Sequence, residues 1–190
     1  METKIILEPS VAEFVTVAVE FCAFIEGIEE IDTRIFVDHT LKLLPLLYLK
    51  ASTLPAVKTF DEDDEEGVLE QYVTEDVYNI IRMNIANVIE RYDDYLEVFK
   101  EDMQYSDTPI KANISEDLSD IYQDLRNFLF IFQLGINETM TQSLIEIQHN
   151  FKHYWGQKVC NAMRALHDVM YTQMPTDQED EMINNKEINE

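Results

Sequence analysis

The sequence predicts an all-α fold, a single-domain antiparallel helical bundle of about five main helices. The chain has 190 residues, enough for one domain with a sizeable core, and 46% of them are hydrophobic. It contains only four glycines and five prolines, too few for the many turns of a β sandwich. Apolar residues also recur at intervals of three and four, the period of an amphipathic helix. We expect the bundle to span residues 1–174.

The first two helices are predicted from their caps and apolar stripes. The first follows Pro9, with Ser10 as its N-cap, and the second begins after the N-cap Asp32. Residues 41–49, LKLLPLLYL, are apolar nearly all round, so the second helix should be central in the bundle. Pro45 should kink this helix, because a proline cannot donate the backbone hydrogen bond of a helix interior.

The charge of the chain is unevenly placed: two segments are strongly acidic, and the remainder of the chain is acidic as well. The formal net charge is −24, and an acidic loop is predicted near residues 52–70, which include the run DEDDEE, and a disordered acidic tail at 175–190. Such a charge repels nucleic acid and an anionic membrane surface, so neither is expected as a partner. The charge permits a basic protein as a partner, or cations, and the sequence leaves the oligomeric state open.

The remaining three helices are likewise predicted from capping residues and apolar patterns. Thr74 should cap the third, whose apolar pattern continues through Tyr95, Leu96 and Phe99. Ser115 should open the fourth, and Gly135 should end it in a left-handed conformation. Asn137 should cap the fifth, which runs to about residue 173 and should bend near Gly156.

The two cysteines and the absence of targeting signals suggest a compartment. Cys22 and Cys160 lie among apolar residues and are expected to be reduced core residues. The N-terminus has no signal peptide, and no stretch of about 18 apolar residues predicts a membrane span. We therefore expect a cytoplasmic protein.

Three segments carry a resemblance to a known family. They are LLPLLYLKAS (residues 43–52), ISEDLSDIYQDLRNFL (114–129) and FKHYWGQKVCNAMRALH (151–167). With their DLSDIYQDL and YWGQK motifs they resemble an uncharacterised family of bacterial helical proteins, known as a domain of unknown function. The resemblance implies an all-helical fold and a bacterial cytoplasmic origin, and it assigns no catalytic residue.

Lys158 is the most informative polar residue, because a helical wheel places it inside the apolar stripe of the fifth helix. A lysine buried there needs a carboxylate. If the fourth and fifth helices are antiparallel, Asp117 and Asp124 flank the facing stripe, and Asp117 matches Lys158 best in distance from the turn. One interpretation is a structural ion pair. The other is a ligand-binding pocket that also includes Tyr122 and Gln157.

A metal site is the alternative for the histidines of the fifth helix. His149 and His153 are spaced i, i+4, as in two-histidine zinc sites, and Glu146 precedes His149 at the spacing found in di-iron bundles. The wheel, however, places all three opposite the apolar stripe, and the chain supplies this motif only once. We therefore expect a solvated face, with no metal and no cofactor.

These features leave three hypotheses for the function. The favoured one is a non-enzymatic acidic module that binds another protein, because the sequence contains no G-x-S-x-G, P-loop or Gly-rich dinucleotide motif. The second is a metal-dependent enzyme that uses Glu146, His149 and His153, or the aspartates of the seam. The third is a small-ligand sensor with a pocket at Lys158, between the fourth and fifth helices.

Overall fold

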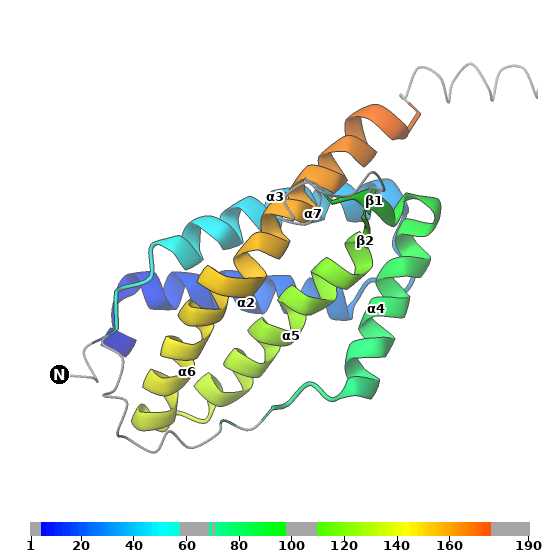
Figure 1. Cartoon of the computed structure of the whole chain (residues 1–190). Coiled ribbons are helices and arrows are strands. Elements are labelled where there is room, and N and C mark those ends of the chain that lie inside the picture. Colours follow the sequence, from blue (N-terminus) through cyan, green and yellow to red (C-terminus); the bar gives the residue numbers. More distant parts are fainter. Residues whose placement is uncertain (1–4, 58–68, 70, 98–109, 176–190) are drawn as a thin grey trace, which may run out of the picture.

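In the part of the chain that the structure describes, five main helices and one short hairpin form the fold (Figure 1). The structure is a computed structural model, and it describes residues 5–57, 69, 71–97 and 110–175. The first four helices are α2 (Pro9–Glu26), α3 (Thr33–Ser52), α4 (Glu75–Ile89) and α5 (Ile114–Gln133). The all-α prediction is confirmed, whereas most of the predicted acidic loop and nearly all of the acidic tail lie outside the described residues.

The fifth helix is a long rod with two irregular turns. It consists of α6 (Asn137–Asn150), the π-helical turn η3 (Phe151–Trp155), α7 (Gly156–Asp168) and a second π-helical turn, η4 (Val169–Gln173). In Figure 1 the rod changes direction between α6 and α7, close to the predicted bend at Gly156. None of the helices in the described ranges is long and apolar enough to cross a membrane.

Two of the predicted N-caps, Asp32 and Thr74, are confirmed, and the other three are wrong. The Asp32 carboxylate accepts hydrogen bonds from the backbone N–H groups of the second and third residues of α3, and the Thr74 hydroxyl accepts one from Val77. Glu8, rather than Ser10, is the N-cap of α2, because a proline suits the first helical position, where its missing N–H costs nothing. Asn137 is likewise the first helical residue of α6, and its N-cap is Ile136.

The third helix ends ten residues earlier than its apolar pattern suggested. Glu90 has φ 52°, which stops α4, and a 3₁₀ turn follows over Glu90–Tyr92. Strand β1 (Asp94–Leu96) then pairs antiparallel with β2 (Lys111–Asn113). The spacing of Tyr95 and Leu96 fits a short strand as well as a helix, so the sequence could not separate the two. Phe99 lies outside the described residues.

Asp93 joins the end of α4 to the start of α5. Its carboxylate oxygens accept hydrogen bonds from the backbone N–H and the hydroxyl of Ser115, each 2.7 Å long. Ser115 is therefore the second residue of α5 rather than its N-cap, and a carboxylate 22 positions away in the sequence satisfies the helix terminus. This contact also fixes β1 against the first turn of α5.

The core is organised around α5, which contacts α2, α4, α6 and α7. Phe14, Phe128 and Trp155 lie at its centre, with ring centroids 5.5 Å apart for Phe14 and Phe128 and 6.4 Å apart for Phe14 and Trp155. The expectation that the second helix is central is wrong, because Leu46 and Leu49 on α3 are 41% and 54% exposed.

The two cysteines differ in their surroundings. Cys22 is buried against the core, as predicted, but Cys160 is exposed on α7. Neither forms a disulfide.

Candidate functional site

Lys158 lies between two carboxylates of α5. Its Nζ is 2.9 Å from Oδ1 of Asp117 and 3.1 Å from Oδ2 of Asp120. The side chain of Asp117 is only 2% exposed, that of Asp120 is 13% exposed and that of Lys158 is 28% exposed. The predicted pairing of Lys158 with Asp117 is confirmed, and Asp120 is a second partner.

Two tyrosine hydroxyls donate hydrogen bonds to the two remaining carboxylate oxygens. The Tyr95 hydroxyl on β1 donates a hydrogen bond to Oδ2 of Asp117, and the Tyr78 hydroxyl on α4 donates one of 2.8 Å to Oδ1 of Asp120. We call Tyr78, Tyr95, Asp117, Asp120 and Lys158 the lysine cluster. It connects α4, β1, α5 and α7, and each of its four carboxylate oxygens has a partner.

Burial and pairing set the protonation states in the lysine cluster. Burial raises the pKa of Asp117, and the hydrogen bonds from Tyr95 and Lys158 oppose that shift only in part. Burial alone would lower the pKa of Lys158, but the two carboxylates outweigh it and raise this pKa above its usual range. Burial, followed by the hydrogen bond to Asp117, also raises the pKa of Tyr95. Lys158 therefore remains charged and the phenol remains a donor.

The structure does not bring the other predicted pocket residues to Lys158. The Tyr122 hydroxyl donates to Glu26 of α2 over 2.8 Å, on a different side of α5. Gln157 is exposed and bonds to Asn161 of its own helix. Asp124 accepts a 2.7 Å hydrogen bond from Asn150. A helical wheel gives the direction of each side chain around its own helix, but it does not show which neighbouring helix or strand lies in that direction.

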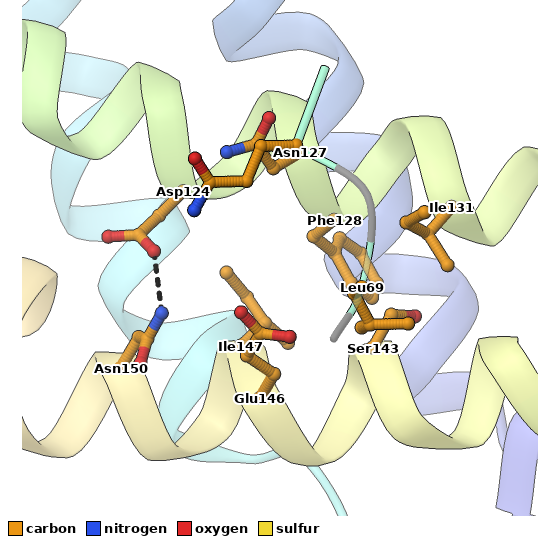
Figure 2. A pocket seen from close by; sticks show the side chains of 10 residues that line it. Leu69, Asp124, Asn127, Phe128, Ile131, Ser143, Glu146, Ile147 and Asn150 are labelled. Carbon is orange, nitrogen blue, oxygen red and sulfur yellow. Dashed lines mark hydrogen bonds between the residues drawn. The ribbon is translucent and has the colours of Figure 1, made fainter. Parts of the chain in front are cut away.

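A small cavity with both polar and apolar walls lies beside Asp124 (Figure 2). Its volume of about 30 Å³ is enough for a single water molecule. Figure 2 shows Asp124 and Asn127 on one side of the cavity and Ser143, Glu146 and Asn150 on the other. The cavity is too small for an organic ligand, but it leaves Asp124 partly buried next to a second acidic side chain.

Burial raises the pKa of Asp124 to about 6. The hydrogen bond from Asn150 lowers this pKa, whereas the charges of Glu146 and Asp120 raise it further. Because the folded protein holds this proton more tightly than the unfolded chain does, ionisation of Asp124 costs stability above about pH 6. The contribution of this group becomes more favourable as the pH falls from 7 towards 4.

Replacement of Asp124 by Asn should therefore stabilise the protein at pH 8. The amide oxygen can still accept from Asn150, and the buried charge is gone, so we expect a gain of about 1–2 kcal/mol in the free energy of unfolding. Urea denaturation at pH 8 and pH 5 measures the effect, which should shrink at the lower pH. Asp168→Asn, on the exposed surface, is the control. A loss of stability at pH 8 would show that the charge of Asp124 is needed in the fold.

Glu146, His149 and His153 are only the alternative metal candidates. His149 and His153 are exposed, and their rings lie 4.6 Å apart along one face. Figure 2 shows the Glu146 carboxylate directed to the small cavity beside Asp124. Within the described parts of the chain, no three His, Cys, Asp or Glu side chains are placed to hold a metal ion.

A larger cleft lies between the β1 strand and α7. Its volume is about 520 Å³, which falls in the size range of small-molecule sites. Tyrosines from the segment around β1 form one wall, and Arg164 and His167 of α7 belong to the other. Of the residues that the structure describes, those that line it are Tyr92, Asp94, Tyr95, Leu96, Ile114, Asn161, Arg164, Ala165, His167, Asp168, Val169 and Gln173.

The lysine cluster fixes one wall of this cleft. The ring of Tyr95 lines the cleft, while its hydroxyl is held by Asp117. Asn161, another lining residue, also hydrogen-bonds to Tyr95. The apolar pattern of the sequence does not reveal this site, since the cleft depends on the β1–β2 hairpin and that pattern predicts a helix at Tyr95.

Comparison with known proteins places the chain in a family. No curated protein matches it. Protein BF1032 from Bacteroides fragilis, a structural genomics target with a crystal structure, is 51% identical and superposes with a TM-score of 0.78. The match covers 91% of this chain and 98% of that chain. Residues 5–172 match a domain of unknown function, DUF5063. The chain therefore belongs to the DUF5063 family, as the resemblance of its helical motifs implied.

Proposed function

We propose that this protein is a binding protein whose ligand occupies the cleft between β1 and α7. The observation that carries the proposal is the cleft itself, about 520 Å³ in volume and lined in equal measure by aromatic or apolar and by polar or charged side chains. This is the small-ligand hypothesis, with the pocket at the surface that Lys158 helps to shape instead of at Lys158 itself.

The contacts of the lysine cluster favour binding over catalysis at this place. Asp117, Asp120 and Lys158 satisfy one another and two tyrosines, so their charges serve to hold α4, β1, α5 and α7 together. A wall that is fixed before the ligand arrives lowers the ordering cost of binding. The cluster thus makes the cleft a preformed site.

A cleft-filling variant tests the proposed function. The full chain and its Ala165→Phe variant are incubated with a small-molecule extract of bacterial cells and analysed by native mass spectrometry. We expect a bound small molecule on the wild type that is absent from the variant. Because Ala165 is only 7% exposed, Tyr92→Ala, at a half-buried residue that packs against the edge of the core, serves as a second variant. Equal retention of the same molecule by all three proteins would contradict the proposal.

The second candidate function is the acidic module that binds a basic protein. It is favoured by an open recess of about 290 Å³, where Glu29, Asp32 and Glu90 meet the C-terminal turn of α4. Carboxylates at a helix C-terminus attract a lysine or arginine side chain of a partner. A photo-crosslinker at Asn87, in the recess, should then capture a basic protein in the bacterial cytoplasm, where we propose that the protein resides. Glu90→Lys should abolish the crosslink, and a crosslink that persists would count against this candidate.

A further inference from the structure

The charges that line the cleft suggest the chemistry of its ligand. The chain has 14 lysines and arginines against 38 aspartates and glutamates, yet Arg164 and His167 lie together on one wall. Arg164 is exposed and has no hydrogen-bond or ion-pair partner among the described residues. An unpaired guanidinium in a concave site is a ready partner for an oxyanion, which it can bind through two parallel hydrogen bonds.

The acidic residues of the same cleft already have partners. Asp94 accepts a 2.9 Å hydrogen bond from Asn113 and pairs with Lys111 at 3.4 Å. Asp168 accepts a 2.7 Å hydrogen bond from Gln173. Lys111 therefore offsets part of the charge of Asp94, while the Asp168 carboxylate has a neutral amide as its hydrogen-bond partner. The charge of Arg164 has no partner of opposite charge among the described residues.

The opposite wall is aromatic. Tyr92 and Tyr95 both line the cleft and are half-buried. The Arg91 guanidinium lies 4.8 Å from the centroid of the Tyr92 ring and bonds to its hydroxyl, and Asp117 holds the Tyr95 hydroxyl. Two tyrosines whose hydroxyls are tied within the protein present flat apolar surface, which suits a planar ring.

We infer that the ligand of this cleft is a small organic anion with a planar ring, whose oxyanion pairs with Arg164 and whose ring packs against Tyr92 and Tyr95. The inference rests on the proposed function, because it names the ligand class of the same site. A carboxylate, sulfonate or phosphate offers Arg164 the same chemistry. His167 lies on the same wall and can donate a further hydrogen bond.

Two fluorescent probes separate the anion from the ring. Anilinonaphthalene sulfonate is an aromatic anion whose emission rises on binding, and phenylnaphthylamine is the same ring system without the sulfonate. We expect the full chain to bind the sulfonate more tightly, and Arg164→Gln to weaken this binding about tenfold or more, the value of a charge-assisted hydrogen bond. Arg82→Gln on α4, another arginine without a partner among the described residues, is the matched control and should leave the affinity unchanged.

The outcomes distinguish the ligand class from the proposed function. If both probes bind the wild type equally, and Ala165→Phe and Tyr92→Ala weaken both, the cleft binds neutral rings. The inference is then overturned while the proposed function stands. If neither cleft variant changes the affinity for the sulfonate, or if Arg164→Gln does not weaken it, the anion is not held here and the inference also fails. The inference is supported if Tyr92→Ala and Arg164→Gln both weaken the binding of the sulfonate probe while Arg82→Gln leaves its affinity unchanged.

Discussion

Replacement of Lys158 by Met should lower the free energy of unfolding by about 3 kcal/mol, because it leaves two carboxylates without their cation. Asp117 is 2% exposed, so water cannot replace the lost ion pair. Urea denaturation at pH 7 measures the loss. Lys152→Met is the matched control: Lys152 is an exposed lysine of the same rod without a partner among the described residues, and its loss should cost less than about 0.5 kcal/mol.

The two acids should respond differently to their own replacement. Asp117 and Asp120 share one lysine and repel each other, a repulsion that contributes to the raised pKa of Asp117. Asp120→Asn should therefore cost less than about 1 kcal/mol, because Asp117 keeps Lys158. Combined with Lys158→Met, Asp117→Asn should recover much of the lost stability, with a coupling energy above about 1 kcal/mol in a double-mutant cycle. Coupling near zero at both acids would mean that Lys158 is held by something else.

The pH dependence of the Lys158→Met variant gives a second check. Without the cation, burial raises the pKa of Asp117 still further above its ordinary value. A carboxyl with a raised pKa in the folded state destabilises the protein when it is ionised, so the loss should be largest at pH 8 and should diminish as the pH falls and Asp117 takes up a proton. A loss that is equal at pH 8 and pH 5 would point to packing rather than charge.

The helices could be predicted because their apolar pattern is local in the sequence. The Lys158–Asp117 pair could be predicted because the two residues are about equally far from the turn that joins their helices. Apolar residues repeat every three or four positions, and antiparallel helices joined by a short turn bring together residues equidistant from it. The same rule places Asp124 level with Asn150, its hydrogen-bond partner in the structure, rather than with Lys158. The expectation that Cys160 is a core residue failed because its neighbours, and not its own angle, were considered. On a helical wheel Cys160 lies about 160° from Leu144, opposite the apolar stripe, and it is exposed in the structure.

The cleft could not be predicted, because it is made by contacts without a local pattern. Tyr95 is 22 positions from Asp117, and Tyr78 is 42 positions from Asp120. Neither tyrosine differs in sequence from one that packs in a core. The hairpin that brings Tyr95 to α7 begins only where the positive φ of Glu90 ends α4, and a glutamate carries no strong preference for that conformation.

Replacement of Gly156 by Ala should destabilise the protein by about 3 kcal/mol, although the same change in an ordinary helix stabilises by about 1 kcal/mol. The π-helical turn over Phe151–Trp155 ends at Gly156, whose backbone N–H donates to the Phe151 carbonyl. A Cβ at this position would lie 2.3 Å from that carbonyl oxygen and 2.9 Å from the Phe151 ring. The carbonyl is backbone and cannot move aside, so the turn itself must change.

The cost should extend to the core, because this turn positions Trp155. The Trp155 indole N–H donates a 3.2 Å hydrogen bond to the carbonyl of Ile147, and its ring lies 4.7 Å from that of Phe151. Thermal and urea denaturation measure the loss, and the near-ultraviolet circular dichroism of the chain's single tryptophan reports its surroundings. Gly27→Ala is the matched control: its Cβ would be 3.4 Å from the nearest atom and its φ is −107°, so the change should stay within about 1 kcal/mol. If both alanines were tolerated equally, the π-helical turn would not require the glycine of the YWGQK motif. The glycine would then have a role other than the stability of the fold.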